Sequence, residues 1–354
     1  MTDGPGSRRR PPDREPLRSR LLGGGTARIL VVVVAALVTV AAISISATRD
    51  GGLAGQSPCG TATPGGTRLP VTPLLTPPPS SVAAVPRFKH VWLVVMENKT
   101  YDQIVGAPTA PFINDLIAKS GLSTRFQAIG HPSQPNYLAL FSGSVQGVTD
   151  DKPHDLTGGA NIADQLEAAG RTWRVYAENV PTGCSNVPTA SGGPDGTGKY
   201  ARKHEPAISF TSISGNPARC AHIAPFTGFD PTAADFEFIV PNLCNDMHDC
   251  PVGTGDAWLR DFLPKITGSA AYRDQGVVFV TWDEGADGTN PPNRIATIVA
   301  SPLVAPGTKS GTPHTHFSLL RTIQDGFGLD CLAASCAANT LGEFFAGAAP
   351  SPSG

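Results

Sequence analysis

Continuous apolar runs alternate with helical patterns along most of the chain. The strongest runs are rich in β-branched residues and cover 90–96, 277–282 and 295–300, with weaker ones at 172–177 and 236–240. Such runs are typical of strands that are covered on both faces. Helical patterns lie between them, at 111–120, 161–169, 257–266 and 316–327. The alternation predicts an α/β fold with a mainly parallel central sheet flanked by helices.

The N-terminal part of the chain has a different pattern. Residues 1–28 are basic and precede an apolar run at 29–47. This run is close to the ~20 residues that cross a bilayer, and the positive-inside rule keeps the preceding arginines in the cytoplasm. We therefore expect a transmembrane signal anchor, although the small residues at 44–47 also suit a cleaved signal peptide. Both alternatives place the remaining chain outside the cytoplasm, either held at the cell membrane or secreted.

The rest of the chain divides by composition. Residues 48–86 are rich in Gly, Pro, Ser and Thr and read as a linker, 87–346 carry the strand and helix patterns, and 347–354 form a flexible tail. Within the patterned domain, residues 185–231 have many glycines and little periodicity, which predicts a loop-rich insertion. The net charge of −2 and the low charged content of 16% give no indication of a nucleic-acid partner. The sequence does not indicate an oligomeric state.

Seven cysteines fit an oxidising compartment. Cys244 with Cys250 and Cys331 with Cys336 are close enough in sequence to close small loops, and Cys184 and Cys220 could pair across the insertion. Cys59 is left over, as a free thiol or an intermolecular link. Zinc binding is the alternative for the Cys244 and Cys250 pair, but the chain has no C-x-x-C spacing.

Acidic side chains follow two of the predicted strands directly. Glu97 and Asn98 come after the strand at 90–96, and Asp283 and Glu284 come after the strand at 277–282. Because the carboxyl ends of parallel strands share one edge of a sheet, these four side chains could converge. Their mutual repulsion would then require a cation. Oxygen ligands favour Ca²⁺, Mg²⁺ or Mn²⁺, and nearby histidines leave Zn²⁺ or iron open. The alternative is that each pair only caps a helix.

Ser133 lies between two prolines in the segment HPSQPNY at 131–137. Pro132 and Pro135 restrict the backbone, so the hydroxyl should sit on a stiff turn. The apolar segment 137–143 ends in glycine and predicts a short helix, whose free N-terminal N–H groups would favour an anion. Ser133 and Asn136 would then lie near a phosphate. A plain surface turn with a capping serine is the alternative.

Histidines also occur on Pro-bounded or Cys-bounded connections. They are His131, His248 beside Asp249, and His316 at the start of the last predicted helix. An imidazole in such a setting can bind phosphate oxygens or protonate a leaving alkoxide. A surface or structural role is the alternative for each of them.

Five of these segments together resemble the phosphoesterase family of bacterial and fungal acid phosphatases and phospholipases C. They appear in matching order between residue 86 and about residue 328. They are VVMENKTYD at 94–102, HPSQPNY at 131–137, NDMHD at 245–249, TWDEG at 281–285 and THFSLLRTI at 315–323.

The resemblance implies an alkaline-phosphatase-like fold and metal-assisted hydrolysis of a phosphate ester through a phosphoserine. It implies that Ser133 is the nucleophile and that His248 and His316 line the phosphate pocket as catalytic residues, where a histidine acts first as acid toward the leaving group and then as base. It also implies that four residues hold the metal: Glu97, Asn98, Asp283 and Glu284. Asn136, His131 and Asp249 would then contact the substrate. Arg294 stands where the family carries a histidine and could bind phosphate as a bidentate donor.

The sequence thus predicts an extracytoplasmic, metal-dependent phosphoesterase that acts on a small phosphate ester, with a phospholipase C acting on phospholipid as the alternative. A serine hydrolase is a further alternative, but no G-x-S-x-G elbow surrounds Ser133. An inert, membrane-tethered binding domain would keep the same fold without the chemistry.

Overall fold

The structure is a computed structural model that describes residues 84–181, 184–191, 198–286 and 293–347. The basic segment, the predicted membrane anchor at 29–47, nearly all of the linker, Cys59 and residues 348–354 lie outside the described residues. Within the described ranges, no helix is both long and apolar enough to cross a membrane.

A nine-stranded sheet forms the centre of the fold, in the order β10-β2-β9-β8-β1-β7-β3-β6, with β11 paired to β2. The central strand β1 (His90–Met96) pairs in parallel with β7 (Phe236–Val240) and β8 (Gly276–Trp282). The strand β9 (Arg294–Ala300) is antiparallel to both of its neighbours, β8 and β2. The remaining strands of this sheet are β2 (Gly121–Gln127), β3 (Trp173–Ala177), β6 (Ile223–Ala224), β10 (Lys309–Ser310) and β11 (His314–Thr315). The predicted α/β fold with a mainly parallel sheet is confirmed.

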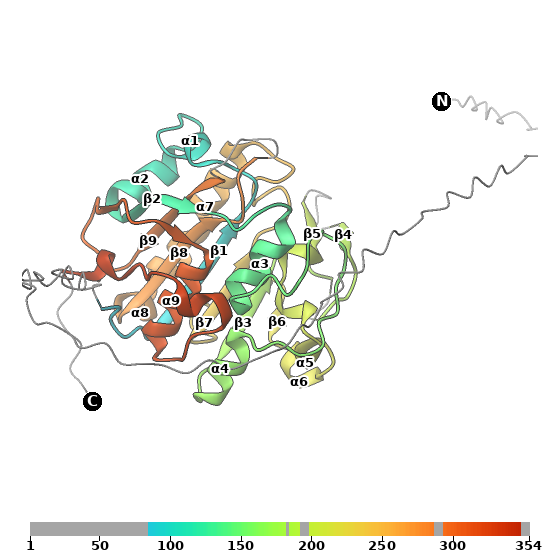
Figure 1. The fold of residues 1–354 in the computed structure, drawn as a ribbon. Helices are drawn as coiled ribbons and strands as arrows, with labels where there is room; N and C mark the ends of the chain where they lie inside the picture. Colours follow the sequence, from blue (N-terminus) through green and yellow to red (C-terminus); the bar gives the residue numbers. More distant parts are fainter. Residues whose placement is uncertain (1–83, 182–183, 192–197, 287–292, 348–354) are drawn as a thin grey trace, which may run out of the picture. The chain divides into compact units, whose positions relative to one another are not determined.

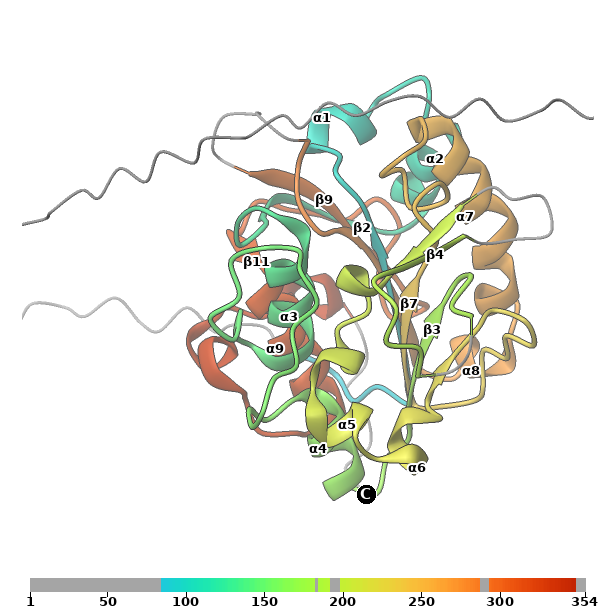
Figure 2. The same ribbon diagram turned by 90° about the vertical axis from the view of Figure 1, so that its right-hand side faces the viewer.

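Helices cover both faces of the sheet (Figures 1 and 2). One face carries α3 (Ser133–Ser142), α4 (Ile162–Ala168) and α9 (His316–Phe327). The other carries α2 (Pro111–Lys119), α7 (Val252–Thr267) and α8 (Ala270–Arg273). The shorter helices are α1 (Tyr101–Ile104), α5 (Thr211–Ser214), α6 (Pro217–Cys220), and the 3₁₀ turns η1 (Arg202–His204), η2 (Ala207–Ser209), η3 (Ala333–Ala337) and η4 (Gly342–Phe345).

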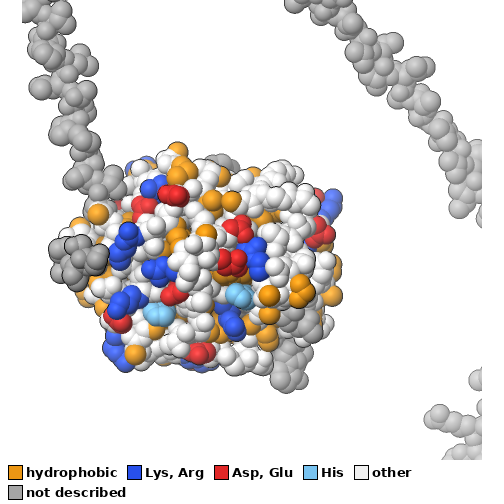
Figure 3. All heavy atoms as spheres, turned by 90° about the horizontal axis from the view of Figure 1, so that it is seen from below, with side chains coloured by type: hydrophobic (Ala, Val, Ile, Leu, Met, Phe, Trp, Pro, Cys, Tyr) orange, Lys and Arg blue, Asp and Glu red, His pale blue; other side chains and the backbone are white. Residues whose placement is uncertain are grey.

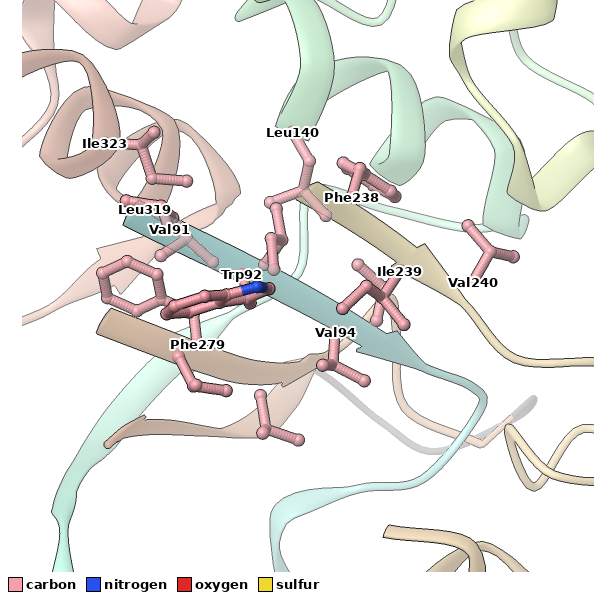
Figure 4. Packing of buried hydrophobic residues seen from close by; sticks show 14 of the residues in the cluster. Val91, Trp92, Val94, Leu140, Phe238, Ile239, Val240, Phe279, Leu319 and Ile323 are labelled. Carbon is pink, nitrogen blue, oxygen red and sulfur yellow. The ribbon is translucent and has the colours of Figure 1, made fainter. Parts of the chain in front are cut away.

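Burial of the central strands explains their continuous apolar sequences. All seven residues of β8 are buried, as are six of the seven in β1. Leu140 of α3 and Leu319 and Ile323 of α9 lie over β1 and β7 (Figure 4). Helices pack on both faces of the sheet, so the side chains on both sides of a central strand are buried. Such a strand therefore needs apolar residues at every position.

The helix that contains Ser133 starts earlier than the sequence predicts. We expected it at 137–143, whereas α3 begins at Ser133 itself and ends where Gly143 adopts a left-handed conformation with φ 71°. Pro135 is compatible with this start, because the first turn of a helix leaves its N–H groups without intrahelical acceptors. Ser133 is therefore the first helical residue.

The predicted insertion at 185–231 has short elements and long connections. It contains the hairpin of β4 (Thr189–Ser191) and β5 (Lys199–Ala201), followed by η1, η2, α5, α6 and β6. The disulfides Cys184–Cys220, Cys244–Cys250 and Cys331–Cys336 are all formed, which confirms the three predicted pairs. On the face that Figure 3 shows, acidic and basic side chains are interspersed.

Candidate active site

Three carboxylates meet at the carboxyl edge of the sheet. Met96 and Trp282 are register partners at the ends of β1 and β8, so Glu97 and Asp283 follow side by side. Asp283 N donates to Met96 O at 2.9 Å, and Glu97 N donates to the carbonyl of Asp246 at 2.8 Å. Asp246 belongs to the loop after β7, the other neighbour of β1. All three side chains are fully buried.

Burial makes these carboxylates hard to ionise without a counter-charge. It raises the pKa of Glu97 and of Asp246 well above the ordinary range, and neighbouring carboxylates raise both further. Burial also raises the pKa of Asp283 to about 6. Within the described part of the chain, Asp283 Oδ2, Asp246 Oδ2 and Asn98 Oδ1 are buried without a hydrogen-bond partner. Buried carboxylates with unpaired oxygens fit a divalent cation with oxygen ligands.

Ser133 lies against this cluster. Its Oγ donates toward Glu97 Oε2 at 3.1 Å and lies 3.4 Å from Glu284 Oε1, and the side chain is 1% exposed. Asn98 is next to the same group, since its backbone N–H donates to Asp283 Oδ1 at 3.1 Å. The structure thus brings Ser133 together with the predicted cation ligands Glu97, Asn98, Asp283 and Glu284.

Glu284 also contacts two other polar residues of the segment 131–137, His131 and Asn136. His131 Nδ1 lies 2.7 Å from Glu284 Oε2, and Asn136 Nδ2 lies 3.4 Å from the same oxygen. Asn136 Oδ1 accepts the N–H groups of Ile129 and Gly130, so this side chain also fixes the segment before Ser133. His131 remains partly exposed, at 38% of its side chain.

A second group of ligand atoms includes a histidine that the sequence did not single out. Glu97, His204 and His248 each offer one atom, and these atoms lie within 4.8 Å of one another. His204 Nε2 is 3.2 Å from Glu97 Oε1, and its Nδ1 is 3.4 Å from Asp246 Oδ2. Burial lowers the pKa of His204 well below its usual value, so the ring is neutral and can bind a cation.

Tyr137 supports this group from α3. Its hydroxyl donates to Glu97 Oε1 at 2.6 Å, and its ring stacks on His204 with centroids 5.0 Å apart.

The loop closed by Cys244–Cys250 positions His248. Its Nδ1 lies 2.7 Å from the Asp249 carboxylate, and its backbone N–H donates to Asp246 Oδ1 at 2.7 Å. Its Nε2 lies 3.4 Å from Lys203 Nζ. Asp249 therefore orients His248. None of the described contacts of Asp249 joins it to Ser133.

His316 is buried at the start of α9. Its Nε2 lies 2.6 Å from the carbonyl oxygen of Asp283, which can only accept, so Nε2 carries the proton. Nδ1 has no hydrogen-bond partner among the described residues. Burial lowers the pKa of His316 to about 4, so the ring is neutral at pH 7. Nδ1 of this neutral ring can accept a hydrogen bond or bind a cation.

Arg294 is engaged outside the carboxylate cluster. Its guanidinium stacks on Tyr101 at 3.6 Å, and its Nε donates to Thr124 O at 2.9 Å. None of its described contacts joins it to Ser133.

Asp246, His204, Lys203 and Tyr137 are the site residues that sequence reasoning missed. A weaker signal existed for Asp246, because it lies in the loop after the predicted strand at 236–240, whereas Glu97 and Asp283 follow their strands directly. His204 had no such signal, because it lies in the aperiodic insertion and reaches the site only through the fold.

Comparisons with known proteins identify the family of this chain. The model of the Phosphoesterase family matches residues 107–330. Phosphatidylinositol-3-phosphatase of Mycobacterium tuberculosis is 37% identical over 70% of this chain and 80% of its own length. An acid phosphatase of Aspergillus fumigatus is 30% identical over 72% of this chain, which spans 58% of that protein. A structure from Vibrio parahaemolyticus in the alkaline phosphatase superfamily has a TM-score of 0.50 at 15% identity, with 71% of this chain and 69% of that chain covered, and so confirms the fold alone. By its family match and its mycobacterial relative, this chain belongs to the Phosphoesterase family.

Proposed function

We propose that this chain hydrolyses phosphate esters outside the cytoplasm, with a divalent cation and through a phosphoserine at Ser133. The observation that carries the proposal is the position of the Ser133 hydroxyl, between the carboxylates of Glu97 and Glu284 at the first residue of α3. A helix N-terminus favours an anion, and the buried carboxylates call for a cation beside it.

Glu97, Asn98, Asp283 and Glu284 would hold the cation, and His204 offers a nitrogen ligand next to Glu97. A divalent cation at such a site lowers the pKa of a hydroxyl and neutralises phosphate oxygens. The ion itself is left open among Ca²⁺, Mg²⁺, Mn²⁺ and Zn²⁺, because the donors include both oxygen and imidazole nitrogen.

The side chains divide the reaction between them. Ser133 Oγ would pass its proton to the Glu97 carboxylate, toward which it already donates, and attack the phosphorus, and the bond from phosphorus to the alcohol oxygen would break to give phosphoserine. His248 would give the departing alkoxide its proton and then accept one from the water that hydrolyses phosphoserine. Asp249 holds the imidazole through Nδ1, which leaves Nε2 for this proton.

The substrate class is a small phosphomonoester. The mycobacterial relative is named Phosphatidylinositol-3-phosphatase and the fungal one Acid phosphatase, and a phosphatase releases phosphate from a monoester. A phospholipase C activity on phospholipid is the second candidate that the family resemblance offers.

The location rests on two features. The chain starts with a basic segment followed by the apolar run at 29–47, and three disulfides fit an oxidising compartment. We infer that the catalytic domain is outside the cytoplasm, held by an uncleaved anchor or secreted after cleavage.

Hydrolysis of p-nitrophenyl phosphate and p-nitrophenyl phosphorylcholine by the full chain tests the proposal. We expect activity on the first, lost after treatment with a chelator and restored by one divalent cation. Activity on the second alone would favour the phospholipase C alternative. Activity on neither substrate, or activity that a chelator leaves intact, would refute the metal-dependent mechanism.

A further inference from the structure

A cavity of about 120 Å³ lies beside the candidate active site. It opens to solvent at Pro188 and Thr189, two exposed lining residues where β4 begins. Its charged lining residues are Asp151, Arg202 and Lys203, so two of the three are basic. None of the proposed catalytic steps uses this cavity.

Arg202 uses only part of its hydrogen-bonding capacity. Its side chain is 1% exposed, and its Nη2 donates to Asp155 Oδ1 at 2.8 Å and to the carbonyl of His154 at 3.0 Å. Among the residues that the structure describes, no acceptor contacts Nε or Nη1, and both atoms are buried. Because buried donors in native proteins are nearly always hydrogen-bonded, these two nitrogens are suited to an acceptor from outside the chain.

The acids near Arg202 leave its charge incompletely balanced. The side chain of Asp155 is 65% exposed, so solvent screens its ion pair with Arg202. The two carboxylate oxygens of Glu205, the next acid along the chain, accept backbone N–H groups of η2 at 2.9 and 3.0 Å. The buried guanidinium therefore favours an anion.

Asp151 and Lys203 connect the cavity to the catalytic serine. Asp151 Oδ2 pairs with Lys203 Nζ at 2.9 Å, and its Oδ1 accepts the backbone N–H of Gln134, directly after Ser133, at 3.0 Å. Both oxygens of this acidic lining residue are thus already bound by donors. Lys203 Nζ also lies 3.4 Å from His248 Nε2, so the cavity and the candidate site share the wall that Lys203 forms.

We propose that the cavity binds a second anionic group, a phosphate or a carboxylate, beside the phosphoryl group that Ser133 attacks. Nε and Nη1 of Arg202 would donate to its oxygens, and Lys203 would add positive charge from the shared wall. Guanidinium donors suit carboxylate and phosphate oxygens, and the apolar lining residues Ala201 and Leu243 strengthen such bonds by excluding water.

The second anion has two sources of the same chemistry. It is either part of a phosphate ester that carries two anionic groups, in which case the inference rests on the proposed function, or a free anion such as inorganic phosphate.

Calorimetry with inorganic phosphate tests the site itself. The full chain, loaded with its divalent cation, should bind a second phosphate besides the one at Ser133. Arg202→Gln should weaken this second binding about tenfold or more, the scale of a lost hydrogen bond to a charged group. Arg219→Gln, which removes a guanidinium paired with Asp164 and Glu167, is the matched control and should keep both phosphates. A single phosphate per unchanged chain would overturn the proposal.

Thr189 allows a test that does not alter a buried residue. It is exposed and is the register partner of Ala201, next to Arg202. Thr189→Lys should strengthen binding of the second phosphate about threefold and Thr189→Glu should weaken it by a similar factor, because each places a charge at the opening of the cavity. Equal effects of the two variants would contradict an anion in the cavity.

Esters of straight-chain diols distinguish the two sources. Bisphosphates of increasing chain length are compared with the monophosphates of the same diols. An anion that belongs to the substrate should raise kcat/KM about tenfold or more for the bisphosphate at one length, and Arg202→Gln should remove this preference. Equal values at every length, with the second phosphate still bound, would assign the cavity to a free anion. If the unchanged protein binds the second phosphate but hydrolyses no p-nitrophenyl phosphate, the proposed function fails and the anion site stands.

Discussion

Replacement of Asp283 by asparagine should stabilise the cation-free protein at neutral pH while it removes activity. Asp283 is fully buried, and its Oδ1 accepts the N–H of Asn98, a bond that the asparagine oxygen can keep. Its Oδ2 has no hydrogen-bond partner in the described ranges. The substitution therefore removes a buried charge and keeps the bond to Asn98.

The size and the sign of the effect follow from the pKa of Asp283. Burial raises this pKa from 3.8 to about 6. Between these two pH values the folded chain keeps a proton that the unfolded chain releases, so rising pH destabilises the fold. Above the pKa of the folded state, the free energy of unfolding is lower by about 3 kcal/mol because of this shift. For a domain of this size it corresponds to about 6–12 °C in the thermal midpoint.

The assay is thermal unfolding in the presence of a chelator at about pH 4 and about pH 7. We expect Asp283→Asn to unfold at a higher temperature than the unchanged protein at neutral pH, and this gain to vanish at the acidic pH. Added divalent cation should stabilise the unchanged protein and not the variant. Asp274→Asn, in an exposed pair with Lys89, is the control. A variant that is equally or less stable than the unchanged protein at both pH values would refute the reasoning.

Three further substitutions test other parts of the site. The 2.6 Å hydrogen bond from Tyr137 lowers the pKa of the Glu97 carboxyl, and Tyr137→Phe removes this bond. The cation affinity measured by calorimetry should therefore fall about 10-fold, and an unchanged affinity would contradict this role of Tyr137. His204→Ala should lower cation affinity as well, because its nitrogen lies within 4.8 Å of the Glu97 and His248 ligand atoms, and metal content equal to that of the unchanged protein would count against it. The double variant Cys244→Ser, Cys250→Ser removes the disulfide that closes the loop of Asp246 and His248. We expect kcat to fall and the free energy of unfolding, measured with denaturant, to drop by about 2 kcal/mol. Full activity would show that hydrogen bonds alone hold the loop.

The sequence predicted the central layout because burial leaves a direct mark on it. Strands covered on both faces need apolar side chains throughout, so β1 and β8 could be predicted from their sequences. The acidic residues that follow them could then be recognised as candidates for the site. Parallel neighbours then bring Glu97 and Asp283 to one edge. The fold class and the three disulfides are confirmed, and the phosphoric ester hydrolase is confirmed at the level of the family. The extracytoplasmic location and the membrane anchor stay predictions.

The order and the direction of the strands could not be predicted from the sequence. An apolar run does not record which strand pairs with which, so the place of β7 beside β1 and the arrival of Asp246 at the cluster could not be predicted with certainty. For the same reason the antiparallel direction of β9 left no mark in its sequence. The strand β2 was missed because its polar residues at 123–125 interrupt the apolar pattern.

Tertiary contacts decided the remaining residues. His204 is placed by η1, because the other two residues of this turn, Arg202 and Lys203, pair with Asp155 and Asp151 from a distant loop. Arg294 was a candidate phosphate donor by its position in the chain, but the ring of Tyr101 lies under its guanidinium. Neither contact has a local sequence signature.

Detection of the covalent intermediate tests the central claim most directly. The full chain, loaded with its divalent cation, is mixed with p-nitrophenyl phosphate, quenched in acid within one turnover, digested and analysed by mass spectrometry. We predict one phosphoryl group on Ser133, absent after chelator treatment and absent in Ser133→Ala, whose cation content should stay near that of the unchanged protein. Turnover by Ser133→Ala, or a phosphoryl group on another residue, would contradict the account.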